Sequence, residues 1–174
     1  MIVWIASRAL SPFMAVSLII LLAGGCGFQL RTWDLGSNID SFFVEVAGNN
    51  PLETAVHAAM RQAGVTPAES ASSAQVVVSL MEYRRSRRGA SVNARARVAE
   101  YRLNLSVRYA VRTVGKQLLA PQWARSGRVY QVDRENLVGS NEEQELLERE
   151  MRSDLVGQII RAVNAGTTEP VSAD

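Results

Sequence analysis

The chain has 174 residues, of which 47% are hydrophobic and 21% are charged; this balance fits one globular domain and excludes a disordered or fibrous protein. One cysteine, Cys26, and one histidine, His57, exclude an intrachain disulfide, a thiolate zinc cage and a pair of imidazole ligands. The net charge of +2 hides an asymmetry, because residues 84–128 hold 12 basic side chains against the single acid Glu100, whereas acids predominate in residues 133–154.

The first 26 residues have the pattern of an export signal. A positive charge at Arg8 precedes an apolar run over residues 13–23, which as a helix would reach only about 16 Å, roughly half of a bilayer core. Two glycines then precede Cys26, and this junction resembles the lipobox of bacterial lipoproteins, in which the cysteine is acylated. We therefore expect residues 1–25 to be a lipoprotein signal peptide and Cys26 to carry the lipid; the alternative is an incidental cysteine behind an ordinary secretory signal.

The next part of the chain predicts a tether, a strand and a helix. Residues 26–40 show little periodicity and are interpreted as an N-terminal tether, whereas Phe42–Ala47 is rich in Phe and Val and predicts a strand. Asn50-Pro51-Leu52-Glu53 offers a helix start, and Gly64 suits the left-handed residue that ends a helix, before a polar loop at residues 66–73. The expected apolar face of this helix consists of Leu52, Val56, Ala59, Met60 and Ala63.

Three further strands are predicted. Residues 75–83 are rich in β-branched side chains, and residues 99–112 alternate between apolar and, except for Ala110, polar ones, which predicts a long strand with one buried and one wet face. Val114-Gly115-Lys116 predicts a turn into an antiparallel partner over residues 117–130, interrupted near Pro121 because proline cannot donate to the ladder. The expected buried face consists of Ala99, Tyr101, Leu103, Leu105, Val107, Tyr109 and Val111, and the wet face includes Arg102, Arg108 and Arg112.

The last predicted element is an amphipathic helix. Ser140-Asn141-Glu142-Glu143 forms a capping box after a connecting loop at residues 133–139, and apolar residues then recur at steps of three and four up to Gly166. We interpret residues 41–166 as a single domain and residues 167–174 as a disordered tail. The predicted fold class is α+β, with the order β-α-β-β-β-α and two helices packed on one face of a four-stranded mixed sheet.

The densest group of charges is an arginine run that starts at residue 84. Six guanidiniums flank a loop of small residues, Gly89–Ala94, where they would create a strong positive potential. We interpret them as a candidate site for the phosphates of an anionic head group; the alternative is a solvated basic hairpin that protects strand edges from aggregation. A nucleic acid is disfavoured because no recognition motif with stacking aromatics lies nearby. The candidate residues are Arg84, Arg85, Arg87, Arg88, Arg95 and Arg97.

Catalytic signatures are missing from the sequence. It contains no Gly-rich phosphate loop, no Ser-x-x-Lys and no Gly-x-Ser-x-Gly motif. His57 is interpreted as a partly exposed helix residue, and the acids at residues 142–150 fall near a helix start, where the macrodipole favours them. We therefore predict that the protein is not an enzyme and needs neither a cofactor nor a metal.

Three segments together resemble the LptE family of lipopolysaccharide-assembly lipoproteins. They are Cys26-Gly27-Phe28-Gln29-Leu30-Arg31, Ala99-Glu100-Tyr101-Arg102-Leu103 and Asn141-Glu142-Glu143-Gln144. The resemblance extends to about Ala165 and implies two helices on a four-stranded sheet, in agreement with the elements predicted above. It also implies that basic residues on loops at one end of the sheet bind the ligand, and Arg95 and Arg97 are the nearest such residues here.

The resemblance implies a role in the outer membrane without catalysis. A member of this family is held in that membrane by N-terminal acyl chains and lies largely inside the lumen of the LptD β-barrel, facing the periplasm. It plugs the barrel, assists its assembly and binds lipopolysaccharide during transport to the outer leaflet. The alternative is a structural envelope lipoprotein that chaperones another membrane complex through a basic protein-docking surface.

The lipid anchor generates the first prediction. Replacing Cys26 by serine removes the thiol that is acylated, so the variant should leave the membrane fraction, because two or more acyl chains are what makes such anchoring stable. Sedimentation of membranes followed by immunoblotting measures this. Unchanged co-sedimentation of Cys26→Ser would disprove the lipid-anchor hypothesis.

Overall fold

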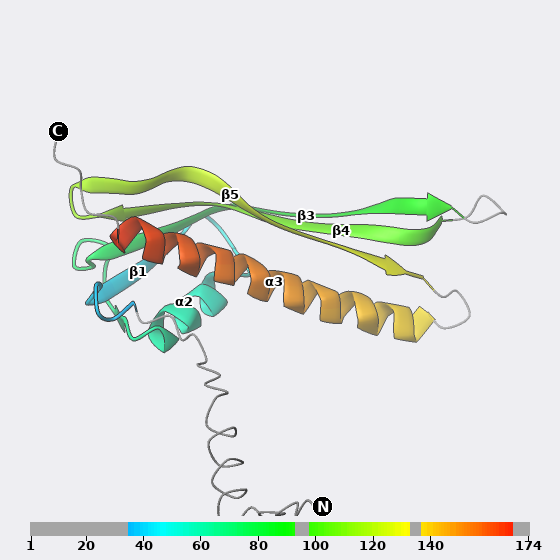
Figure 1. Cartoon of the computed structure of the whole chain (residues 1–174), viewed down its shortest axis with the longest axis horizontal. Coiled ribbons are helices and arrows are strands. Elements are labelled where there is room, and N and C mark those ends of the chain that lie inside the picture. The colour runs from blue at the N-terminus through cyan, green and yellow to red at the C-terminus, as the bar shows by residue number, and fades with distance from the viewer. Residues whose placement is uncertain (1–34, 93–97, 133–136, 169–174) are drawn as a thin grey trace, which may run out of the picture. The chain divides into compact units, whose positions relative to one another are not determined.

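A computed structural model describes the structure of residues 35–92, 98–132 and 137–168. Figure 1 shows one layer of strands with both helices on the same face of it, which confirms the predicted α+β class. The elements in chain order are β1 (Ser41–Val46), α2 (Glu53–Gln62), β2 (Thr66–Pro67), β3 (Val76–Val92), β4 (Val98–Thr113), β5 (Lys116–Gln131) and α3 (Leu137–Thr168).

The sheet is mixed, with the strand order β2-β1-β3-β4-β5. β1 is parallel to β2 and β3, and the β3-β4-β5 meander is antiparallel. The prediction of four strands was one short, because Thr66–Pro67, predicted as a loop, forms the edge strand β2. Two residues are too few to show a periodicity. Proline is tolerated there because an edge strand has no partner on one side, so the lack of an N–H removes no ladder hydrogen bond.

The long hairpins carry most of the sheet. β4 buries Leu103, Leu105 and Val107 and exposes Arg102 and Arg108, so the predicted alternation is confirmed. Gly115 makes the turn into β5 with a φ of 75°. The interruption predicted at Pro121 is a β-bulge: Tyr109 pairs with Gln122 and Val111 with Leu119, so β5 has one extra residue there.

β3 is longer than the sequence suggested. We predicted a strand over residues 75–83, but β3 continues to Val92 and pairs with β4 along this whole length. Residues 84–88 therefore lie within a strand, and not beside a loop that starts at Gly89. The run of arginines has no strand-like apolar pattern, and it is the partner strand β4 that holds it extended.

Helix α2 ends as its flanking residues predict, but it starts later than predicted, because its N-cap is Leu52 and not Asn50. The Asn50 side-chain oxygen accepts a hydrogen bond from the Leu52 N–H at 3.1 Å, and the helix begins at Glu53. After Gln62, Gly64 adopts a φ of 86°, the left-handed conformation that glycine takes without strain. The apolar face is confirmed, since Leu52, Val56 and Met60 are fully buried.

Helix α3 has 32 residues, which corresponds to about 48 Å. The predicted start at the capping box was wrong, because the helix begins at Leu137 and Ser140 is buried inside its first turn. The predicted end at Gly166 was two residues short, since the Thr168 hydroxyl donates to the Asn164 carbonyl at 2.7 Å. Glycine inside a helix costs only about 1 kcal/mol, which packing against the long sheet offsets.

The core lies between the sheet and the two helices. It includes Leu35 and Ile39, which the sequence interpretation had assigned to the tether. The Leu35 N–H and the Gly36 N–H both donate to the Ala63 carbonyl at 3.0 Å, so this segment is joined to the end of α2. Within the described residues, no helix combines the length and apolarity needed to cross a membrane.

Truncation of two leucines on α3 tests this packing. Leu155→Ala should lower the free energy of unfolding by about 2–5 kcal/mol, because Leu155 is 0% exposed and its loss leaves a cavity. The matched control Leu146→Ala, at a side chain that is 48% exposed, should cost about 0.5 kcal/mol. Chemical denaturation measures both values, and equal losses would contradict the described burial.

Candidate functional site

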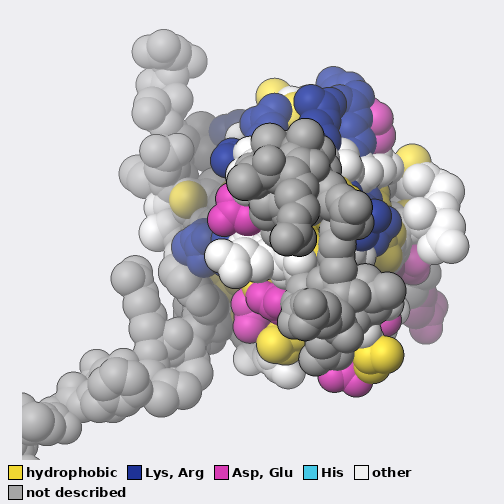
Figure 2. Space-filling model, turned by 90° about the vertical axis from the view of Figure 1, so that its right-hand side faces the viewer, with side chains coloured by type: hydrophobic (Ala, Val, Ile, Leu, Met, Phe, Trp, Pro, Cys, Tyr) yellow, Lys and Arg dark blue, Asp and Glu magenta, His cyan; other side chains and the backbone are white. Residues whose placement is uncertain are grey.

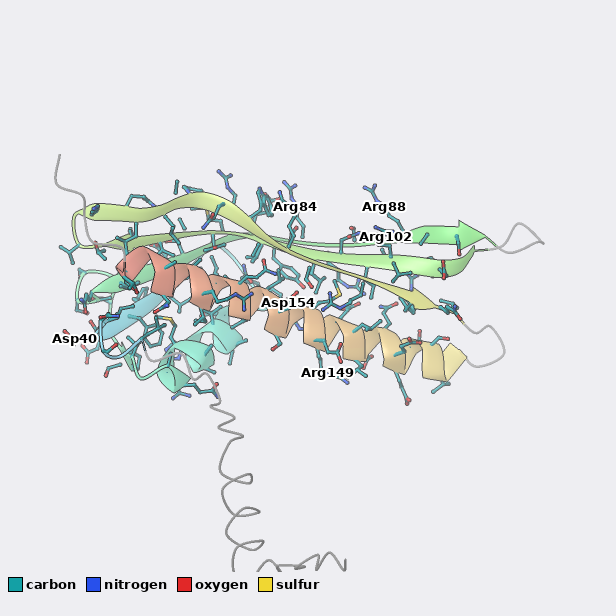
Figure 3. All side chains as sticks on the ribbon, viewed as in Figure 1. Asp40, Arg84, Arg88, Arg102, Arg149 and Asp154 are labelled. Atoms are coloured by element: carbon teal, nitrogen blue, oxygen red, sulfur yellow. The ribbon has the colours of Figure 1, made fainter. Side chains whose placement is uncertain are left out.

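A β-bulge in β3 divides the predicted arginine site between two faces. Leu80 pairs with Tyr109 and Tyr83 with Val107, so β3 has one extra residue in this interval. The bulge reverses the alternation of β3, and beyond it Arg85 and Arg87 share the helix-side face with Leu105 and Leu103 of β4. Arg84 and Arg88 lie on the opposite, open face, as Figure 3 shows.

Two of the six candidate arginines and the candidate lipidation site belong to parts of the chain that the structure does not describe. Arg95, Arg97 and Cys26 lie outside the described residues. The structure places Arg84 and Arg88 on one face and Arg85 and Arg87 on the other, so the thickness of the sheet separates the two pairs.

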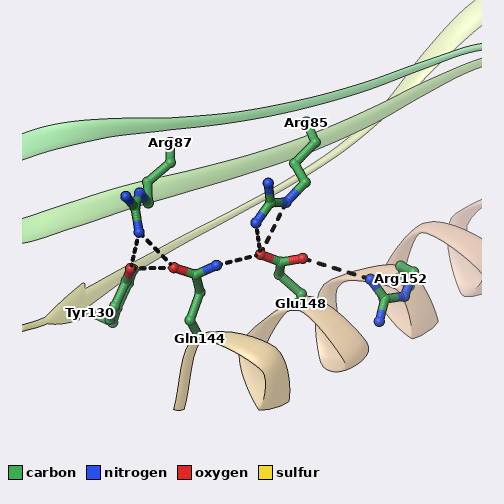
Figure 4. A network of polar contacts seen from close by, with 6 residues as sticks. All are labelled: Arg85, Arg87, Tyr130, Gln144, Glu148 and Arg152. Atoms are coloured by element: carbon green, nitrogen blue, oxygen red, sulfur yellow. Dashed lines mark hydrogen bonds and ion pairs between the residues drawn. The ribbon is translucent and has the colours of Figure 1, made fainter. Parts of the chain in front are cut away.

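On the helix side, Arg85 binds α3. Its Nη2 lies 2.6 Å and its Nε 3.1 Å from the Glu148 Oε1 atom, and Arg152 contributes a second cation at 3.9 Å from Oε2 (Figure 4). The Glu148 side chain is only 12% exposed. The hydrogen bonds from the Arg85 guanidinium lower the pKa of Glu148, and this outweighs the opposing effect of burial.

Arg87 extends the same network toward β5. Its Nη1 donates to the Gln144 side-chain oxygen at 2.9 Å, and the Tyr130 hydroxyl donates to that oxygen at 2.6 Å (Figure 4). The guanidinium also lies 4.6 Å from the centre of the Tyr101 ring. Arg85 and Arg87 therefore attach the first half of α3 to the sheet and are not available for a ligand without breaking these contacts.

The open face of the β3-β4-β5 meander carries six arginines, which we call the arginine face. Both helices pack on the opposite side of the sheet, so neither covers it. In Figure 2 many of the basic side chains gather at the top, over this face, and most of the visible acidic side chains lie lower. The arginine face consists of Arg84, Arg88, Arg102, Arg108, Arg112 and Arg125.

Arg88 and Arg102, the distal pair, lie directly opposite each other on β3 and β4. They belong to the part of the sheet that extends beyond β1, since β1 pairs with β3 only as far as Leu80. No carboxylate in the described part of the chain forms an ion pair with either guanidinium. Like charges at opposed positions destabilise a sheet, so an anion that bridges this pair would be favourable.

The middle of the arginine face contains an aromatic side chain that the sequence interpretation missed. Trp123 of β5 pairs with Arg108, and its ring centre lies 4.5 Å from the Arg84 guanidinium carbon and 5.8 Å from that of Arg125. Arg84 also forms a two-pronged ion pair with Glu82 and lowers the pKa of that carboxyl. Carrying the alternation of residues 99–112 across the turn would have assigned Trp123 to the wet face.

Three acids lie near this face: Glu100, which shares the open face of β4 with Arg102, and two that are already paired. Besides the Glu82–Arg84 pair, Glu45 of β1 lies 3.6 Å from Arg112 and accepts a hydrogen bond from the Ser79 hydroxyl at 2.9 Å. Among the described residues, no three His, Cys, Asp or Glu side chains could together hold a metal ion. The chemistry that the face offers is therefore the binding of anions and of carboxylate-rich surfaces.

These features define a small two-layer α+β domain with one bare, arginine-rich sheet face. The family model of LptE, described as lipopolysaccharide-assembly, matches residues 39–163. The chain belongs to the LptE family of lipopolysaccharide-assembly proteins, as the sequence resemblance predicted. A search of curated proteins gives no significant match.

Solved structures of bacterial lipoproteins share the fold. Rare lipoprotein B from Shewanella oneidensis is 24% identical with a TM-score of 0.65, over 72% of this chain and 95% of that one. Lipoprotein B from Nitrosomonas europaea is 22% identical with a TM-score of 0.68, over 82% and 93% of the two chains. A minor lipoprotein from Acinetobacter baumannii is 23% identical with a TM-score of 0.60, over 76% and 98%.

The helix-side network predicts a pH-dependent stability. Because Arg85 lowers the pKa of Glu148 below 4.5, its contribution is fully present above pH 4.5 and is lost as the pH falls through the lowered value. Glu148→Gln should therefore cost about 1–2 kcal/mol near pH 7, a figure reduced for the half-exposed Arg85, and much less at about pH 3.

Urea denaturation at both pH values measures this difference. Glu145→Gln is the matched control, since that side chain is 75% exposed and its pair with Arg149 spans 4.0 Å, and it should change stability by less than about 0.5 kcal/mol. A loss for Glu148→Gln that is the same at both pH values would show that the ion pair is not the cause.

Proposed function

We propose that this protein is an outer-membrane lipoprotein that plugs the LptD β-barrel, assists its assembly and binds lipopolysaccharide on the way to the outer leaflet. Membership of the LptE family supports this proposal. In it, acyl chains on Cys26 hold the protein in the membrane, and the domain lies in the barrel lumen and faces the periplasm. The role is one of binding and assembly, without a chemical reaction.

The observation that carries the lipopolysaccharide part of the proposal is the distal pair. Arg88 and Arg102 are directly opposed on β3 and β4, with no carboxylate bound to either guanidinium among the described residues. Guanidinium binds phosphate through two parallel hydrogen bonds, and lipopolysaccharide carries phosphates on its sugars. Each such contact is worth about 1.5–3 kcal/mol where water is excluded and less where it is exposed.

The contacts of the other candidate arginines refine this site. Arg85 and Arg87 are bound to α3, and Arg84 is bound to Glu82 and Trp123, so these three serve the structure first. We therefore propose the distal pair as the phosphate-binding centre, with Arg95 and Arg97 as further candidates because they follow β3 directly in the chain.

The plug part of the proposal is consistent with the charge of the arginine face. A water-filled barrel lumen accepts charged side chains, whereas a lipid-facing surface would reject them. A bare sheet face with six arginines therefore fits a polar lumen, and it would be costly in the hydrocarbon region of a membrane.

Charge reversal of the distal pair tests the ligand role. The double variant Arg88→Glu/Arg102→Glu should retain at least about tenfold less lipopolysaccharide than the wild type, because two attractive contacts become repulsive. The measurement is the lipopolysaccharide retained by the tagged, full-length protein in detergent, at low and high salt. The single charge reversal Arg61→Glu, on the exposed side of α2 and away from this face, is the control and should retain it fully.

The outcomes separate the two halves of the proposal. Equal retention by the double variant would contradict the ligand role and leave the barrel-plug role standing. Purification of the wild-type protein with a different membrane complex and without LptD would contradict the plug role and favour the alternative of a chaperone with a basic docking surface.

A further inference from the structure

The arginine face has a second centre besides the distal pair, with a different chemistry. We call it the tryptophan cluster, and it consists of Trp123, Arg84, Arg108 and Arg125 with Glu82 beside them. Trp123 is partly exposed, and the guanidiniums of Arg84 and Arg125 lie against its ring. A large aromatic ring on an uncovered sheet face gains free energy when a partner covers it.

The cluster is held in a fixed geometry. The two cations at 4.5 Å and 5.8 Å restrain the Trp123 ring, and Glu82 restrains Arg84. The backbone of Arg125 is fixed from the other side, because the Gln158 side chain of α3 donates to its carbonyl at 3.0 Å and accepts from its N–H at 3.4 Å. Rigid aromatic and arginine side chains lose little entropy on binding, and these residue types dominate the energetics of protein interfaces.

The charges of the cluster indicate the kind of partner. Within the described structure, Arg108 and Arg125 form no ion pair with a carboxylate, so a partner can supply one to each. Glu82 lies inside the cluster and would repel the concentrated negative charge of a phosphate. An apolar protein side chain over the ring, with separate carboxylates on either side, avoids this repulsion.

We propose that the tryptophan cluster is the anchor by which this domain docks onto an acidic protein surface, which under the proposed function is the inner wall of LptD. This inference rests on that function and assigns its two roles to different parts of one face. The distal pair binds phosphate, and the tryptophan cluster binds protein.

Co-purification with LptD tests the inference. The full-length tagged lipoprotein and LptD are produced together, solubilised in detergent and washed with rising salt, and the LptD recovered per lipoprotein is measured. Trp123→Ala should reduce recovered LptD at least about tenfold, and Trp123→Phe should restore part of it, because truncation of a central tryptophan removes a typical hot spot. Lipopolysaccharide retention should be unchanged.

A second variant guards against loss of folding in Trp123→Ala. Arg108→Glu/Arg125→Glu changes exposed side chains only and should likewise reduce recovered LptD at least about tenfold, while Arg61→Glu should not. Full recovery of LptD by both cluster variants would overturn this inference and leave the proposed function intact. Loss of lipopolysaccharide with full recovery of LptD would also overturn it, and absence of LptD from the wild-type complex would overturn the proposed function itself.

Discussion

One extra residue in β3 organises the surface of this domain. The bulge between Leu80 and Tyr83 reverses the side-chain alternation of the strand, and a run of arginines that follows it is shared between two faces. Without the bulge, Tyr83 and the side chains in register with it would point away from the core. With the bulge, Arg85 and Arg87 reach α3, and Arg84 and Arg88 remain on the open face.

The bulge also separates two kinds of packing along α3. From Met151 onward, the helix buries apolar side chains such as Met151, Leu155 and Ile159 against the sheet. Its first half is joined to the sheet by the network around Glu148 and Gln144, which is polar and partly exposed. The apolar part supplies most of the stability, because the burial of apolar area contributes more free energy than a few half-exposed ion pairs.

This division leaves the open face available for binding. Both helices and the core lie on one side of the sheet, and two of the acids near the other side, Glu82 and Glu45, are already paired with Arg84 and Arg112. The proposed function requires contact with an anionic glycolipid and with a protein partner, and the proposals above assign each to its own part of the arginine face. The two parts differ in chemistry, since one offers paired guanidiniums and the other an aromatic ring.

The sequence by itself determined the class of the fold, the alternation of β4, the turn at Gly115 and the family, because these depend on local periodicity, on glycine conformation and on motifs. It could not determine the edge strand β2, the start of α3 or the full length of β3, which pairing and packing decide. The distribution of the arginines between two faces also required the tertiary structure. A bulge depends on the register between two strands, and the sequence of one strand alone does not specify that register.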